Sequence, residues 1–306
     1  MTIRSDGVSP VSRRSFLLGS AGALVLAACG RGDGGGDEAE AEARSTTTTT
    51  AAGGLAIARV FSPTQPAGRP LRLPLALATA DGAILPADEA PASIAVRWYL
   101  EGATPPAPAS IARRDVGIPT PYFPLEATFP EPGTYLIDID VDGERAATTV
   151  DVVPSERAAF VPGPGEALIP VRTPTVADAR GVDPICTRRP ACPFHDRPLD
   201  AVLGDSQGKA IALIISTPAY CQTAICGPVL DLLVDRAEQH AEVLTVVHAE
   251  VYDDDTAQTT TETVKAYGLG WEPSLFLAAP DGTINARLDY TFDGSELDEV
   301  LSRLVQ

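Results

Sequence analysis

The sequence predicts two folded regions, an antiparallel β-sandwich followed by an α/β region. Short alternating apolar segments between Pro- and Gly-rich turns fill residues 55–153, whereas residues 171–306 alternate buried strand-like runs with helical periods. Between them, at 154–170, prolines and glycines recur as in a linker. With 306 residues, 44% of them hydrophobic, the chain is long enough for two packed cores.

The N-terminus predicts export. Residues 12–17, with two adjacent arginines, resemble the twin-arginine signal, and the apolar run that follows is too short to be a stable membrane span. The run ends in Ala-Ala-Cys-Gly, which resembles the lipobox of bacterial lipoproteins and implies that residues 1–28 are removed and that Cys29 is lipidated. We therefore expect a protein anchored in the membrane by lipid at the extracytoplasmic face of the cell membrane. Residues 29–54, without apolar periodicity, would be a flexible tether.

The charge of the chain excludes one class of partner. Its net charge is −18, from 41 acidic and 23 basic residues, so we expect no binding to nucleic acid through a basic surface. Export also places four further cysteines, Cys186, Cys192, Cys221 and Cys226, in a compartment where disulfides persist.

The first region reads as short antiparallel strands. Apolar and polar residues alternate clearly in the fifth strand, and Asp142-Gly143 predicts a hairpin turn after it. Tyr135 and Trp98 resemble the corner tyrosine and core tryptophan of immunoglobulin-like domains, so both are expected to be structural. We expect a spacer, a partner-binding surface or a lid rather than chemistry. The predicted strands are 55–61, 71–79, 93–100, 122–129, 133–141 and 145–153.

The second region predicts the element order β-α-β-α-β-β-α, preceded by a short helix. Its first strand is a continuous apolar run that suits burial on both faces of a sheet. Gly227-Pro228 then opens a helix with Pro228 in its first turn. A last helix is expected with Ser295 as its cap. The predicted segments are 199–203, 210–215, a helix from about 227, 243–251, 260–267, a hairpin around 275–284, and 295–305.

Two motifs in this region resemble the thioredoxin family. Residues 217–228, with Cys221 and Cys226 spaced C-x4-C, resemble the thioredoxin segment W-A-x-W-C-G-P-C with a longer loop. Residues 267–277 resemble the pattern Y-G-I-x-x-x-P-T-L. The resemblance implies a thioredoxin-like fold over 171–306. It also implies that Pro273 is a cis proline that orients a substrate chain, with Tyr220 and Trp271 as walls of the groove.

Cys221 and Cys226 are the candidate catalytic residues for thiol-disulfide exchange. A thiol between a buried strand and a helix N-terminus faces unpaired N–H groups that stabilise a thiolate, and a second thiol can resolve the mixed disulfide. Counted from the strand, Cys221 occupies the position of the attacking cysteine; counted from Gly227-Pro228, Cys226 does. Which of the two attacks therefore stays open. Ile215 replaces the buried acid of many thioredoxins, and Glu272 beside a thiolate would raise the thiol pKa.

Cys186 and Cys192 are expected to form a local structural disulfide, although four cysteines allow three pairings. With His195 they could also be metal ligands, but the C-x5-C-x2-H spacing is not that of usual zinc motifs and lacks a fourth ligand. His248 lies in an apolar strand and is expected to be a hydrogen-bonded core residue. We therefore expect no metal and no bound cofactor.

The sequence predicts a thiol-disulfide oxidoreductase whose partners are the thiols or disulfides of exported proteins. One alternative is a non-catalytic binding lipoprotein in which both cysteine pairs are structural disulfides. Another is a peroxiredoxin-like peroxidase, although Pro218 and Ile214 replace the Thr or Ser and the Pro that precede the attacking cysteine there. The last is a copper chaperone of thioredoxin-like fold, a class whose cysteine pair is spaced C-x3-C.

Overall fold

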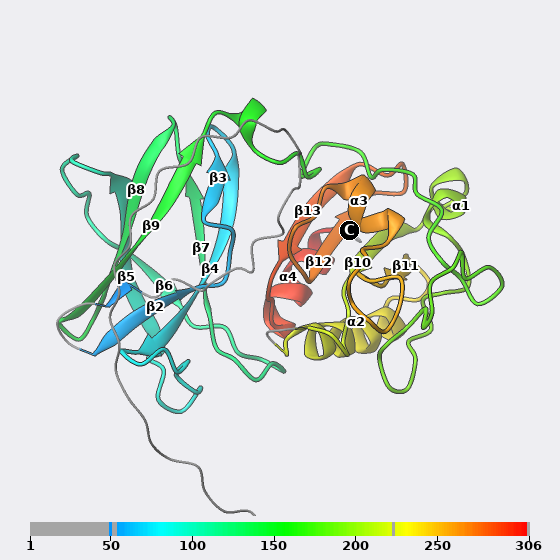
Figure 1. The fold of residues 1–306 in the computed structure, drawn as a ribbon, viewed down its shortest axis with the longest axis horizontal. Helices are drawn as coiled ribbons and strands as arrows, with labels where there is room; N and C mark the ends of the chain where they lie inside the picture. Colours follow the sequence, from blue (N-terminus) through cyan, green and yellow to red (C-terminus); the bar gives the residue numbers. More distant parts are fainter. Residues whose placement is uncertain (1–48, 51–53, 222–223, 305–306) are drawn as a thin grey trace, which may run out of the picture. The chain divides into compact units, whose positions relative to one another are not determined.

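The computed structural model describes residues 49–50, 54–221 and 224–304, and within these ranges it is mostly β-sheet, with three sheets and few helices (Figure 1). The expected export signal, the lipidation site Cys29 and most of the expected tether lie outside the described residues. No helix in the described part of the chain is long and apolar enough to cross a membrane.

Two of the sheets share one core, as in a β-sandwich. Alternate residues of each sheet point inward, so that Leu75 and Leu125 of one pack with Ile137 and Val150 of the other. The first sheet has the order β1 (Thr49–Thr50), β2 (Leu55–Arg59), β4 (Pro70–Thr79), β7 (Phe123–Thr128). The second has the order β3 (Thr64–Pro66), β9 (Glu144–Val153), β8 (Gly133–Val141), β5 (Ser93–Leu100), β6 (Ala109–Ala112).

Most pairings in these two sheets are antiparallel, and all six strands expected from the sequence are present within one or two residues at each end. The exception is β3, which runs parallel to β9. Thr49 and Thr50, inside the expected tether, pair with β2. Two local predictions are confirmed: Asp142 and Gly143 have positive φ angles in the turn between β8 and β9, and the hydroxyl of buried Tyr135 donates to the carbonyl of Glu131 at 3.1 Å.

The third sheet has the order β11-β10-β12-β13, in which β10 runs parallel to β11 and antiparallel to β12. Residues of β10 point alternately to the two faces, and all six are buried. The strands are β10 (Ala210–Ile215), β11 (Leu244–Ala249), β12 (Ser274–Ala278) and β13 (Ile284–Asp289).

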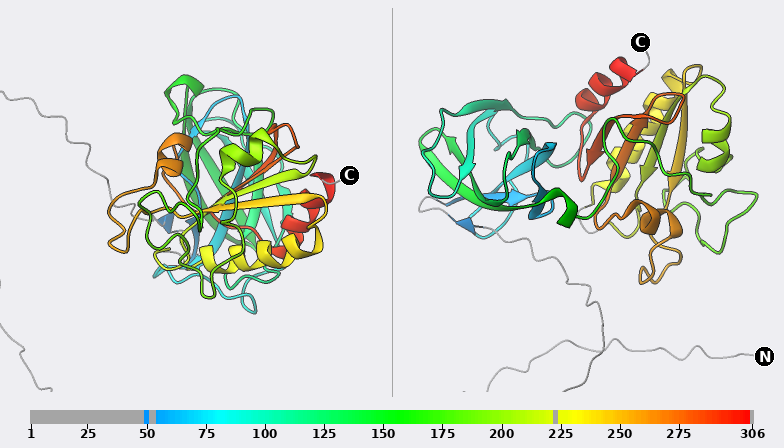
Figure 2. Two further views of the ribbon diagram at one scale, coloured as in Figure 1. Left: turned by 90° about the vertical axis from the view of Figure 1, so that its right-hand side faces the viewer. Right: turned by 90° about the horizontal axis from the view of Figure 1, so that it is seen from above.

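Helices cover both faces of the third sheet. Helices α2 (Cys226–Gln239) and α4 (Gly294–Leu304) lie side by side and pack on the face to which Ala212 and Ile214 point (Figure 2). Helices α1 (Leu199–Gly204) and α3 (Glu262–Tyr267) pack on the face of Ile211 and Leu213. The chain reaches α1 through a short 3-10 turn, η1 (Ser155–Arg157), and a long segment without regular helices or strands.

The expected cap of the last helix is wrong by two residues. Asp293, not Ser295, caps α4: its carboxylate accepts the backbone N–H of Glu296 at 2.8 Å and the hydroxyl of Ser295 at 2.9 Å. A carboxylate at this position also interacts favourably with the positive end of the helix dipole.

Candidate functional site

The register of the third sheet brings three separate segments together at one end of its strands. Ile215, the last residue of β10, pairs with Ala249 on β11 and with Ser274 on β12. The loop after β10, the chain after β11 and the chain before β12 therefore meet at this end of the sheet. Cys221 lies in the first of these segments and Pro273, after a cis Glu272-Pro273 peptide, in the last.

Cys221, Cys226 and Glu272 form a compact group, called here the Cys221 site. The two Sγ atoms and a carboxylate oxygen of Glu272 all lie within 4.8 Å of one another. The backbone N–H of Cys226, the first residue of α2, donates to the Cys221 sulfur at 3.4 Å. Cys226 is fully buried, whereas Cys221 is partly exposed. Of the two thiols, Cys221 is therefore the one that a substrate can reach.

Burial controls the protonation of this site. Burial, together with the negative charges of Cys221 and Glu250, raises the pKa of Glu272 to about 8. Burial also raises the pKa of the Cys226 thiol, with added contributions from the hydrogen bond to Cys221 and the charge of Glu272. Cys226 is therefore a thiol at neutral pH, beside a carboxyl group that titrates close to neutrality. Glu272 lies just before β12. The buried acid that the thioredoxin resemblance would imply belongs at Ile215, the last residue of β10.

The predicted groove residues Tyr220, Trp271 and Pro273 are direct neighbours of Cys221 or Glu272 in the sequence. Pro273 is buried and its carbonyl accepts the N–H of Tyr290 at 2.8 Å. Tyr220 packs edge-on against Tyr252, with ring centroids 6.2 Å apart, and Trp271 stacks on Tyr290 at 5.5 Å. The indole N–H of Trp271 and one oxygen of Glu272 are buried without a hydrogen-bond partner among the described residues.

Cys186 and Cys192 are not joined by the expected disulfide. Their Sγ atoms are 3.8 Å apart, and both approach histidine nitrogens instead. Cys192 Sγ lies 3.3 Å from His195 Nε2 and 3.3 Å from His248 Nδ1. We call these four residues the Cys186 cluster; all are buried, and their ligand-type atoms lie within 4.8 Å of one another.

The Cys186 cluster sits against the free edge of the third sheet. The segment that carries Cys186, Cys192 and His195 lies along β11, where the N–H of His248 donates to the carbonyl of Phe194 at 3.2 Å. The sequence correctly predicts that His248 is buried and hydrogen-bonded. It does not reveal that His248 joins Cys192, which lies 56 residues earlier in the chain. The sequence signal that could have revealed this contact is a histidine in an otherwise mostly apolar strand.

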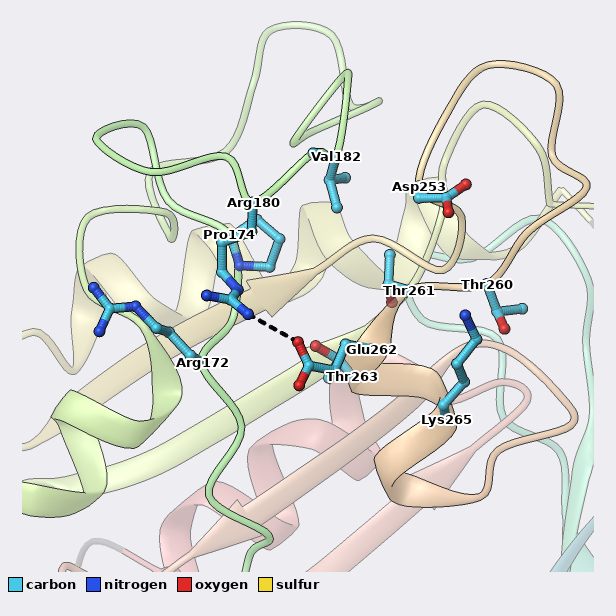
Figure 3. Close-up of a pocket in the computed structure, with 11 residues that line it drawn as sticks. Arg172, Pro174, Arg180, Val182, Asp253, Thr260, Thr261, Glu262, Thr263 and Lys265 are labelled. Carbon is cyan, nitrogen blue, oxygen red and sulfur yellow. Dashed lines mark hydrogen bonds and ion pairs between the residues drawn. The ribbon is translucent and has the colours of Figure 1, made fainter.

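A separate hollow lies beside α3 (Figure 3). It is lined by residues of mixed charge, and its arginine and glutamate side chains partly neutralise each other, as in the ion pair of Arg180 with Glu262 at 3.0 Å. Arg172 and Lys265 also line it. None of its eleven lining residues is a cysteine or histidine, so it belongs to neither cysteine group.

Comparison with protein-family models finds no match, and no curated protein matches the sequence. The two cysteine groups are therefore the features of the chain that bear on its function.

Proposed function

We propose that this chain is an extracytoplasmic thiol-disulfide oxidoreductase that acts on exported proteins and is held at the membrane by a lipid on Cys29. One observation carries the proposal: a partly exposed thiol, a buried thiol and a carboxyl group lie within 4.8 Å of one another at a strand-to-helix junction. Thiol-disulfide exchange requires an accessible attacking thiolate and a second thiol that resolves the mixed disulfide. Cys221 and Cys226 fit these two roles.

The order of the elements supports a thioredoxin-like fold for residues 171–306. Strands in the order β11-β10-β12-β13, with one parallel and two antiparallel pairings, are what the thioredoxin resemblance implies. The cis peptide before Pro273 lies where that resemblance puts a cis proline. The sandwich, with its corner tyrosine Tyr135, supports an immunoglobulin-like domain for residues 55–153.

In the first step the Cys221 thiolate attacks one sulfur of a substrate disulfide. A bond forms between Cys221 and that sulfur, the substrate S–S bond breaks, and the other substrate sulfur leaves as a thiolate. The N–H of Cys226, 3.4 Å from the Cys221 sulfur, and the positive end of α2 stabilise negative charge on Cys221.

In the second step Cys226 resolves the mixed disulfide. Its thiol passes its proton to the carboxylate of Glu272, and the resulting thiolate attacks the Cys221 sulfur. The Cys221-Cys226 bond forms, the bond between Cys221 and the substrate sulfur breaks, and that sulfur leaves as a thiolate, so that both substrate sulfurs are reduced. A dithiol reductant must then return the pair to its starting state; run in reverse, the same steps oxidise a substrate dithiol.

The neighbouring residues bind the substrate chain in this proposal. Pro273 lies directly before β12 next to the cysteines, and Tyr220 and Trp271, each directly before a residue of the Cys221 site, offer apolar area. Above about pH 8, where Glu272 is ionised, its negative charge disfavours acidic segments near the substrate disulfide.

Trapping the mixed disulfide tests the proposal. A Cys226→Ser variant retains the attacking thiol but lacks the resolving one, so it should accumulate covalent adducts with disulfide-bonded exported proteins or with oxidised insulin. A Cys221→Ser variant should trap none. The measurement is non-reducing electrophoresis followed by mass spectrometry of the adducts.

A chain with only structural disulfides would behave differently. Its Cys221-Cys226 bridge would resist dithiothreitol until the protein unfolds, and neither variant would trap substrate. Rapid turnover of hydrogen peroxide without turnover of disulfides would instead favour the peroxidase alternative.

A further inference from the structure

We propose that Cys186, Cys192, His195 and His248 bind one Zn²⁺ ion in a closed tetrahedral site that holds the segment around residues 186–195 against β11. This inference does not depend on the proposed redox function. It uses four buried side chains that the exchange reaction leaves without a role.

The separations among the four atoms are those of a tetrahedron around zinc. With Zn–S bonds of about 2.3 Å and Zn–N bonds of about 2.0–2.1 Å, two sulfurs lie about 3.8 Å apart, a sulfur and a nitrogen about 3.6 Å, and two nitrogens about 3.4 Å. The cysteine sulfurs are 3.8 Å apart, and the nitrogens His195 Nε2 and His248 Nδ1 are 3.2 Å apart. Three of the four sulfur–nitrogen separations are 3.3, 3.3 and 3.9 Å, and the fourth, between Cys186 and His195, is within 4.8 Å.

Hydrogen bonds orient His248 for metal binding. Its Nε2 lies 3.0 Å from the backbone carbonyl of Ser216, which can only accept, so Nε2 carries the hydrogen. The lone pair is then on Nδ1, the atom that faces the other three residues. A ligating histidine whose other nitrogen donates to a backbone carbonyl is the usual arrangement around protein metal ions.

The Cys186 sulfur is also prepared as a thiolate ligand. The backbone N–H of Cys192 donates to the Cys186 sulfur at 3.4 Å, and a hydrogen bond to a sulfur favours its charged form. Two thiolates and two neutral imidazoles around Zn²⁺ give a group without net charge. Such a group can be buried at a far lower cost than isolated charges.

The composition of the group selects zinc among metals. Two cysteines and two histidines in tetrahedral positions form a structural zinc set, and the burial of all four leaves no open position for a substrate. A copper chaperone needs access for transfer of its ion, which this cluster does not offer. A disulfide between Cys186 and Cys192 would leave the two imidazoles without a common partner.

The site also has a structural consequence for the redox loop. His248 holds Ser216, the first residue after β10, through Nε2. Beside it, the N–H of Thr187 donates to buried Glu250 at 2.6 Å, and the N–H of Ala219 donates to the Thr187 hydroxyl at 3.1 Å. A metal ion that fixes Cys186 would therefore also fix the path of the chain just before Cys221.

Metal analysis of the reduced full-length chain tests the inference. Elemental analysis should find one zinc per chain, removable by chelator and restored by added Zn²⁺. Reconstitution with Co²⁺ should give the d–d bands of tetrahedral coordination together with thiolate charge-transfer absorption. X-ray absorption of the zinc form should fit two sulfurs at about 2.3 Å and two nitrogens at about 2.0–2.1 Å.

Matched variants locate the ion. Cys192→Ser and His248→Ala should each weaken Zn²⁺ affinity by at least about a hundredfold, since even loss of an outer-shell partner costs 10–100-fold. The Cys221→Ser/Cys226→Ser double variant should retain one zinc per chain. If a ligand variant fails to fold, the Co²⁺ spectrum and absorption distances of the unaltered chain still decide the ligand set.

Three results would overturn the inference. One is a reduced, folded chain that takes up neither Zn²⁺ nor Co²⁺. Another is zinc that disappears in the Cys221→Ser/Cys226→Ser variant but persists in Cys192→Ser, which would move the ion to the Cys221 site. The third is a Cys186-Cys192 disulfide, found by mass spectrometry in protein that has been kept reduced.

Discussion

The Cys221 site and the Cys186 cluster are each built on two nearby cysteines, but their surroundings differ. At the Cys221 site one sulfur is partly exposed and the third member is a carboxyl group, Glu272. In the Cys186 cluster both sulfurs are buried and the other members are two imidazoles. A carboxyl group exchanges protons with a thiol, whereas imidazole nitrogens share a metal ion with thiolates. The residues around each cysteine pair, more than the pair itself, set the two sites apart.

The same comparison explains why spacing is a poor guide in this chain. The two pairs have almost the same separation in sequence, with five and four intervening residues. Their difference comes from the element to which each is attached: a strand-to-helix junction for Cys221 and Cys226, and an irregular segment along a sheet edge for Cys186 and Cys192.

Removal of the attacking thiol should have the largest effect. We expect Cys221→Ser to slow the reduction of insulin by at least roughly a hundredfold, because a hydroxyl cannot form the mixed disulfide. Zinc content should stay at one per chain. Turbidity of insulin with dithiothreitol as reductant measures the rate; a variant with unaltered activity would contradict the assignment of Cys221.

Removal of a metal ligand should instead act on stability. His248→Ala should lower the free energy of unfolding by roughly 3 kcal/mol, since bound ligand at a hundred times its Kd contributes about 2.7 kcal/mol. Urea unfolding in the presence of Zn²⁺ measures the change. His240→Ala is the matched control, because His240 lies after α2 and outside the cluster. Equal losses in both variants would argue against a metal site.

Chelation should reproduce this effect without a mutation. Excess chelator should lower the melting temperature of the reduced chain by roughly 5–10 °C, given about 2–4 °C for each kcal/mol in a domain of this size. Calorimetry with chelator alone and with chelator plus excess Zn²⁺ measures the shift. An unchanged melting temperature would contradict a structural ion.

Glu272 should give the Cys221 site a pH dependence that Glu272→Gln removes. Its pKa is about 8, so release from the mixed disulfide should rise roughly tenfold from pH 7 to pH 9, as the carboxylate that accepts the Cys226 proton becomes populated. The charged or titratable groups that influence it are Cys221, Cys226 and Glu250, with Tyr252 nearby.

The same shift predicts the sign of a stability change. Because the folded pKa of Glu272 is raised above its ordinary value of 4.5, the stability it contributes is full below pH 4.5 and is lost as the pH rises through about 8. Glu272→Gln should therefore flatten this part of the stability profile, and Glu238→Gln, at an exposed position of α2, should not. Parallel profiles for all three proteins would contradict the role of Glu272.

The smallest effect is expected in the sandwich. Tyr135→Phe removes the hydrogen bond to the carbonyl of Glu131 and should cost about 0.5–1.5 kcal/mol in unfolding free energy. Neither insulin reduction nor zinc content should change. A change in either would show that the sandwich is coupled to the cysteine groups.

The sequence by itself determined most of the regular elements. The apolar run of Ala210–Ile215 predicts a strand buried on both faces, and all six of its residues are buried. Asp142-Gly143 predicts its turn, since glycine adopts a positive φ without steric cost. Three strands were missed: β1 (Thr49–Thr50), which lies inside the expected tether, β3 (Thr64–Pro66), which is three residues long, and β6 (Ala109–Ala112), which lies mostly exposed at a sheet edge. Their sequences carry neither alternation nor an apolar run.

Only the tertiary structure decided which side chains meet. Glu272 follows Cys226 by 46 positions and meets it through the pairing of β10 with β12, whereas His248 follows Cys192 by 56 and meets it because the segment 186–195 lies along β11. Local preferences come from the residues near each position in the chain, so they can specify a strand or a turn. The placement of distant segments comes from packing of the whole core, and it is this packing that brings Glu272 to one cysteine pair and His248 to the other.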